Sequence, residues 1–85
     1  MSKDLGLIGL WRKERDEVVK TLDIKKFKEF YRKWKLKGFY NIPLPDDAVI
    51  EISLHKMLYN INSATDEEKS KAKEWLESRG YSTEM

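Results

Sequence analysis

Asp47, Glu51 and His55 are the residues of this chain whose types and spacing suit catalysis or metal binding. On a helix, positions i, i+4 and i+8 lie near one face, where two carboxylates and an imidazole can bind a metal or transfer a proton. An exposed polar strip on an amphipathic helix has the same spacing, and we favour this second interpretation. The His-Glu-x-x-His motif of metalloproteases requires two histidines, and the chain has one.

Other reactive side chains are scarce. The absence of cysteine excludes disulfides, thiolate zinc sites and thiol nucleophiles. No glycine-rich phosphate-binding loop precedes a predicted strand. We therefore expect no catalytic residue, no bound metal or cofactor and no small-molecule substrate, and the chain is predicted not to be an enzyme.

A dense basic segment is the strongest indication of function. Residues 25–37 carry seven cations against one acid, Glu29, and cations at this density suit phosphates or acidic proteins. Phe30, Tyr31 and Trp34 are interleaved with them and could stack on bases. The candidate residues for binding a partner or nucleic acid are Lys25, Lys26, Lys28, Arg32, Lys33, Lys35 and Lys37.

The periodicity of this segment argues against stacking of its aromatic rings on bases. At about 100° per residue, Ile24 and the aromatic residues up to Trp34 fall within an arc of about 120°, and every cation lies outside it. We expect the rings to form the core, while the cations face solvent or a partner. Leu36 falls among the cations, where it is a candidate anchor for a partner.

Local signals place the basic segment on a helix over residues 24–37. Asp23 is suited to cap its start. Gly38 is suited to the left-handed conformation that ends a helix, which would bring Phe39 onto Trp34. The start, the end and the period all predict the same helix.

Two helices are expected after it. The two prolines in residues 39–45 prevent regular helix there. A helix over residues 47–61 has apolar strips on two sides, so we expect a central helix with neighbours on both; its β-branched residues 49–52 leave a strand as the alternative. A capping box formed by Thr65 and Glu68 predicts a last helix, which extends to about residue 79.

The first part of the chain is less regular. A first helix is predicted from Trp11, Val18, Val19 and Leu22. However, Gly6 and Gly9 each cost about 1 kcal/mol inside a helix relative to alanine. Residues 1–10 are therefore expected to continue this helix or to form an apolar arm. Such an arm packs on its own domain, on a partner or on a second copy. The candidate residues for an apolar interface are Leu5, Leu7, Ile8, Trp11 and Leu36.

Length, composition and charge define the class of protein. Eighty-five residues, 40% of them hydrophobic, suit one small folded domain. No apolar stretch approaches the roughly 18–20 residues that span a bilayer, so we expect a soluble, cytoplasmic protein without a transmembrane segment. The net charge of +2 combines +6 over residues 12–37 with −4 over residues 38–85. Such a dipolar chain attracts partners of opposite charge, including a second copy of itself.

Together these observations predict an all-α fold, a small four-helix bundle with three core helices plus an N-terminal helix or arm, in one domain over residues 1–85. The composition is similar to that of small accessory proteins of bacteria and their phages. The predicted function is a non-enzymatic binding or adaptor protein that presents the basic helix to an acidic protein or to a second copy. The alternative is backbone-directed, sequence-nonspecific binding of nucleic acid by the same helix.

Overall fold

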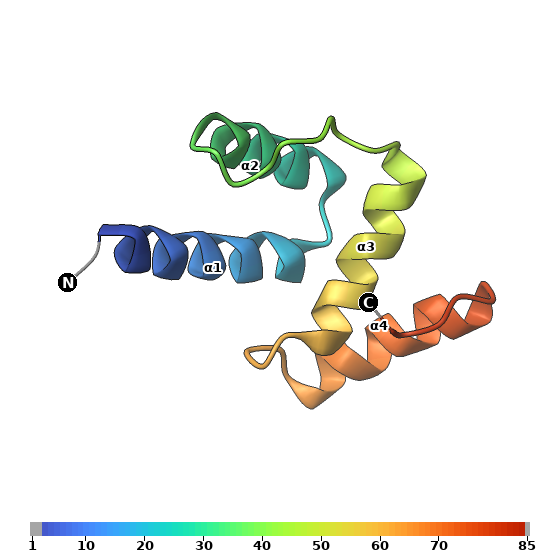
Figure 1. The fold of residues 1–85 in the computed structure, drawn as a ribbon. Helices are drawn as coiled ribbons and strands as arrows, with labels where there is room; N and C mark the ends of the chain where they lie inside the picture. The colour runs from blue at the N-terminus through green and yellow to red at the C-terminus, as the bar shows by residue number, and fades with distance from the viewer. Residues whose placement is uncertain (1–2, 85) are drawn as a thin grey trace.

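The computed structural model describes the backbone of residues 3–84 and the side chains of residues 6–84. This part of the chain is all α and contains no strand, which confirms the predicted fold class and rejects the strand over residues 49–52. Figure 1 shows α1 and α2 side by side and antiparallel, α3 running past the end of α1 and the start of α2, and α4 beside α3. The four helices are α1 (Lys3–Thr21), α2 (Ile24–Leu36), α3 (Asp47–Asn60) and α4 (Asp66–Ser78).

Side-chain caps begin α2 and α4 at the predicted residues. An Asp23 carboxylate oxygen accepts hydrogen bonds from the backbone N–H groups of Lys25 and Lys26, at 2.9 and 3.2 Å. Thr65 and Glu68 form the expected capping box, in which each side chain accepts from the backbone N–H of the other residue. These bonds satisfy amide donors that have no partner within the helix.

The same two helices end on glycines with positive φ. Gly38 (φ +88°) and Gly80 (φ +80°) adopt the left-handed conformation that side chains disfavour. In both cases the next backbone N–H donates to the carbonyl five residues earlier, from Phe39 to Trp34 at 3.0 Å and from Tyr81 to Leu76 at 2.9 Å. This is the helix ending predicted at Gly38, and the same ending occurs at Gly80.

The core lies where α3 meets the other three helices. Helix α3 contacts each of them, as its two apolar strips predicted. Its main strip is buried through Ile50, Leu54 and Leu58, whereas on the other side Ile52 and Tyr59 are half-buried. Helix α4, with few apolar residues, buries Ala72 and Leu76. The largest fully buried side chains are Trp34, Ile50, Leu54, Leu76 and Val19.

Helix α1 extends beyond the rest of the molecule. Residues 3–10 are helical rather than an irregular arm, although Gly6 and Gly9 lie within them. The radius of gyration is 13.5 Å, against about 12 Å for a compact domain of this length. Figure 1 shows the cause, since the start of α1 projects past the end of α2. Leu7, Ile8 and Leu10 are exposed on this projecting part.

Candidate functional site

The aromatic face of α2 is turned inward. Phe27, Phe30, Tyr31 and Trp34 are all buried. The Tyr31 ring stacks on Tyr40 with centroids 4.1 Å apart, and the Trp34 ring meets Phe39 edge to face at 4.8 Å. Because stacking on bases requires an accessible ring face, these rings do not supply it in this fold.

The seven cations predicted as binding residues divide into two groups. Three of them are engaged within the domain. Lys28 pairs with Asp47 at the start of α3, and Lys33 donates to Glu14 of α1 at 2.8 Å. Lys33 and Lys37 also lie over the Trp34 ring, with Nζ 5.6 and 5.7 Å from its centroid. The two ion pairs hold α2 against its neighbours, whereas the contacts with the Trp34 ring lie within α2 and its C-cap. Both kinds of contact leave these three cations less free for a partner.

The other four cations, together with Leu36, form the outward face of α2. They are Lys25, Lys26, Arg32 and Lys35, and all four are exposed. No described acidic side chain lies within ion-pair distance of them. At helical spacing, Lys25, Arg32 and Leu36 share one stripe with Glu29, and Lys35 flanks it. Leu36 is 90% exposed, which is high for a leucine.

The predicted apolar interface is only partly available. The side chain of Leu5 lies outside the described residues. Leu7 and Ile8 are exposed and border a hollow of about 280 Å³ beside Phe39, at the end of α2. Trp11 instead packs within the domain, where its ring stacks on Phe39 with centroids 5.8 Å apart.

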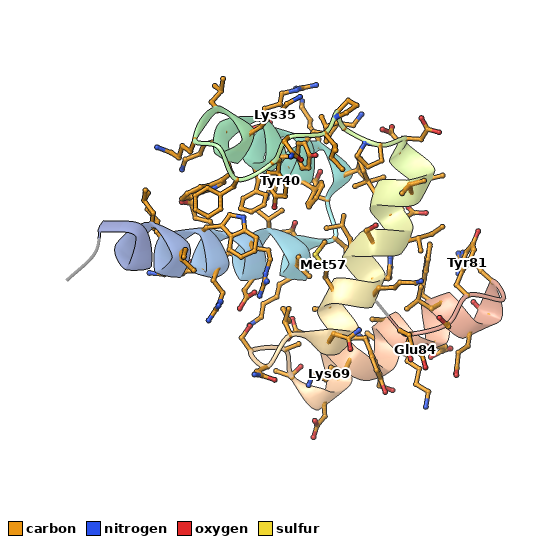
Figure 2. All side chains as sticks on the ribbon, in the orientation of Figure 1. Lys35, Tyr40, Met57, Lys69, Tyr81 and Glu84 are labelled. Atoms are coloured by element: carbon orange, nitrogen blue, oxygen red, sulfur yellow. The ribbon has the colours of Figure 1, made fainter. Side chains whose placement is uncertain are left out.

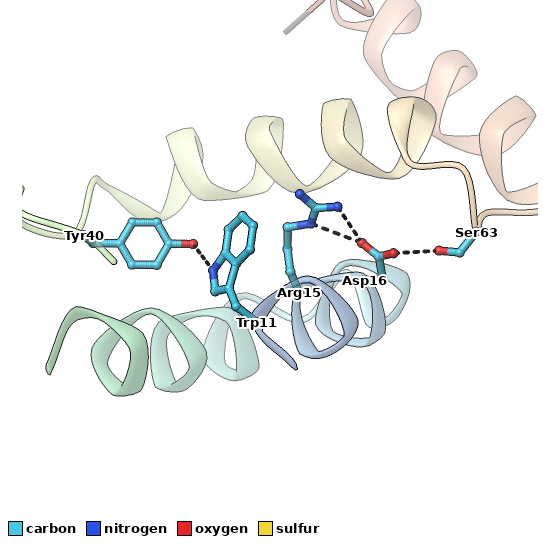
Figure 3. A network of polar contacts seen from close by, with 5 residues as sticks. All are labelled: Trp11, Arg15, Asp16, Tyr40 and Ser63. Atoms are coloured by element: carbon cyan, nitrogen blue, oxygen red, sulfur yellow. Dashed lines mark hydrogen bonds and ion pairs between the residues drawn. The ribbon is translucent and has the colours of Figure 1, made fainter. Parts of the chain in front are cut away.

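A hydrogen bond fixes Trp11 to the loop between α2 and α3. Its indole Nε1–H donates to the Tyr40 hydroxyl at 3.1 Å (Figure 3). Figure 2 shows Tyr40 in the space between α1 and α2. Burial raises the pKa of the Tyr40 hydroxyl above its ordinary value, and the bond from Trp11 opposes this effect without cancelling it. The hydroxyl therefore stays neutral and accepts from the indole.

Arg15 and Asp16 connect α1 to the loop after α3. Arg15 donates through Nε and Nη2 to one Asp16 oxygen, at 3.1 and 2.9 Å. The other Asp16 oxygen accepts from the Ser63 hydroxyl at 3.1 Å (Figure 3). The Arg15 guanidinium also lies over the Trp11 ring, 5.1 Å from its centroid. This row of contacts follows the space between α1 and α3.

The structure does not bring Asp47, Glu51 and His55 together as a reactive group. Asp47 pairs with Lys28 of α2. His55 is 7% exposed, and its ring lies flat on Trp75, with centroids 3.8 Å apart and planes 6° apart. Its Nδ1–H donates to the backbone carbonyl of Glu51 at 2.7 Å, so the Glu51 carboxylate has no part in the contact. His55 packs as a flat ring between α3 and α4.

Sequence reasoning missed the contribution of α1. Trp11, Arg12 and Arg15 were not recognised as neighbours of the loop and of α3. The signal was present, since Trp11 and Arg15 stand four residues apart on one helix face. What the spacing does not specify is which surface that face meets.

The described residues contain no group of three or more His, Asp or Glu side chains placed to hold a metal ion. None of the helices in residues 3–84 has the length and apolar character needed to cross a membrane. Comparison of the chain with protein-family models, with curated proteins and with solved structures finds no match.

Proposed function

We propose that this protein is a non-enzymatic binding or adaptor protein whose outward face of α2 docks on an acidic protein surface or on a second copy. The observation that carries the proposal is Leu36, exposed at the end of a helix face that carries four cations, none of which forms an ion pair with a described acidic side chain. Cations speed and orient the encounter with an acidic surface, and the leucine contributes apolar contact area.

The same feature favours a protein partner over nucleic acid. Phosphate binding uses cations and polar donors, and an exposed leucine adds nothing to it. Base stacking is opposed because the rings of α2 are buried. Nucleic-acid binding is therefore the alternative that the experiment has to separate.

A second copy offers a complementary surface. Residues 38–85 carry a net charge of −4, and Glu74 and Glu77 are exposed on α4. Contact between α2 of one copy and α4 of the next would be head-to-tail, which builds rings or chains rather than a symmetric dimer. Self-association of this kind should weaken as salt screens the charges.

The test uses two charge-reversed variants with the same net charge. Lys25→Glu/Arg32→Glu changes the outward face of α2, and Lys13→Glu/Lys20→Glu changes exposed lysines of α1. Either pair moves the net charge from +2 to −2. We expect the first variant to lose the partner, in affinity capture from native extract and in sedimentation of the purified protein, and the second to keep it.

Leu36→Ser separates protein from nucleic acid without a change of charge. We expect it to weaken capture of a protein partner, and we expect nuclease treatment of the extract to have no effect. Capture that disappears with nuclease, is unaffected by Leu36→Ser and falls with salt at a log–log slope of about −0.9 per phosphate would establish the alternative. A protein that stays monomeric and captures nothing would refute both.

A further inference from the structure

A hollow lined by aromatic rings opens between α1, α3 and the loop after α2. Its volume is about 340 Å³, and its walls include Trp11, Phe27, Tyr31, Tyr40 and Met57. Ile42, 62% exposed, stands on its loop side. Figure 2 shows Met57 on the side of α3 that faces α1. A space of this size and lining suits one bulky apolar group.

A second, polar hollow adjoins the first. Its volume is about 390 Å³, and it shares Arg15 and Met57 with the aromatic hollow. Its other lining residues include Arg12, Asn60 and Asn62. The two hollows therefore lie next to each other along α1 and α3, on either side of Arg15 and Met57. We refer to them together as the groove, with rings at one end and guanidinium and amide groups at the other.

The charge of the polar end is positive. Asp16 accepts two hydrogen bonds from Arg15 and neutralises part of its charge. Arg12 is exposed, and no acidic side chain among the described residues forms an ion pair with it. A carboxylate bound at this end would meet Arg12 first, in the two-pronged geometry that guanidinium groups favour.

We propose that this groove binds a segment of another protein in which a bulky apolar side chain stands beside an acidic residue. The apolar side chain enters the ring-lined hollow, and the carboxylate pairs with Arg12. The exposed amide of Asn62 is placed to donate to and accept from the backbone of such a segment. An open groove with these groups suits an extended peptide better than a small molecule, which proteins usually enclose. The site is separate from the outward face of α2 and does not depend on the function proposed for it.

The test titrates the folded full-length protein with capped peptides. The probe is acetyl-Phe-Glu-Glu-amide, and the nuclear magnetic resonance readouts are the Trp11 indole N–H and the Met57 methyl group. We expect saturable shifts of both signals. Acetyl-Ala-Glu-Glu-amide, which lacks the anchor, should bind at least about tenfold more weakly. Acetyl-Phe-Gln-Gln-amide, which lacks the charge, should bind about three- to tenfold more weakly.

Two variants locate the binding. Arg12→Gln, at an exposed position, should abolish the difference between the charged and uncharged Phe peptides while leaving the circular dichroism spectrum unchanged. Ser53→Leu places a larger side chain in the wall of the aromatic hollow and should block both peptides. Lys25→Glu/Arg32→Glu should bind the probe as the parent protein does, so failure of the α2 proposal leaves this one standing.

Three results would overturn the proposal. The first is the absence of saturable shifts with acetyl-Phe-Glu-Glu-amide. The second is equal binding of the charged and uncharged peptides, or binding that ignores both Arg12→Gln and Ser53→Leu. The third is tighter binding of phenylacetate or dodecanoate than of the peptide, which would make the groove a site for small apolar acids.

Discussion

Trp34 and Trp11 differ in burial and in hydrogen bonding, and replacing each by phenylalanine tests which of the two matters more for stability. We expect the more buried tryptophan to lose less free energy of unfolding. Trp34 is fully buried, and its indole N–H has no hydrogen-bond partner among the described residues. Trp11 is only half-buried, yet its N–H donates to Tyr40. We therefore expect Trp34→Phe to be tolerated better than Trp11→Phe.

The magnitudes follow from what each substitution removes. Trp34→Ala removes a fully buried ring, at a cost of about 3–5 kcal/mol. The whole domain has a stability of about 4–13 kcal/mol, so at the lower end of that range this change brings the protein to the edge of unfolding. Trp34→Phe loses part of the ring contacts, but it also removes the buried indole N–H, which has no partner in the described part of the chain and costs the folded state about 1–3 kcal/mol. The two effects offset each other, so we expect the free energy of unfolding to change by no more than about 1 kcal/mol.

Trp11→Phe has no such compensation. It deletes a hydrogen bond worth about 0.5–1.5 kcal/mol and leaves the half-buried Tyr40 hydroxyl without that donor. Lost packing on Phe39 adds to this, so we expect a cost of about 1–2 kcal/mol. The difference between the two phenylalanine variants thus reports the hydrogen bond rather than the extent of burial.

Urea unfolding followed by far-ultraviolet circular dichroism measures these changes without relying on tryptophan emission. Leu36→Ala, on an exposed side chain of the same helix, is the control and should leave the midpoint unchanged. Trp34→Phe as damaging as Trp34→Ala would show that the indole N–H is satisfied. Trp34→Ala with an unchanged midpoint would place the rings of α2 outward and remove the case against base stacking.

Three further predictions concern glycines and pH. Gly9 lies inside α1 with open space around an added Cβ, so Gly9→Ala should raise the free energy of unfolding, measured by thermal denaturation, by up to about 1 kcal/mol. Gly38 adopts a positive φ, so Gly38→Ala should lower the free energy of unfolding by about 1–2 kcal/mol. The reverse order would contradict both assignments. The backbone hydrogen bond from Thr65 holds the pKa of Glu68 below its ordinary 4.5. The ionised carboxylate therefore stabilises the fold fully above pH 4.5, and this stabilisation is lost as the pH falls below it. Chemical unfolding across acid pH should therefore be less pH-dependent in Glu68→Gln, and identical curves would refute the capping role. Burial raises the pKa of the Tyr40 hydroxyl above 10.0. The neutral hydroxyl therefore contributes fully to the stability of the fold below pH 10.0, and this contribution is lost as the pH rises further. Spectrophotometric titration should find a phenolate that forms at higher pH than that of free tyrosine, and Tyr40→Phe should remove this phase.

The boundaries of α2 and α4 and the orientation of the aromatic face of α2 were predictable from the sequence. A cap such as Asp23, an ending such as Gly38 and a stripe such as Phe27 to Trp34 depend on residues within a few positions of one another. Their hydrogen bonds and periodicity operate within a single helix and do not require knowledge of its neighbours.

The tertiary structure decided how these surfaces are used. The sequence presents seven equivalent cations, but helix packing joins Lys28 to α3 and Lys33 to α1 and leaves four others on the outward face. His55 is one residue of a polar strip until α4 places Trp75 on its ring. The groove beside Arg12 likewise exists only because α3 crosses α1. Contacts of this kind join residues far apart in the chain, so they depend on the angles and distances at which helices cross, and spacing along one helix carries no information about those.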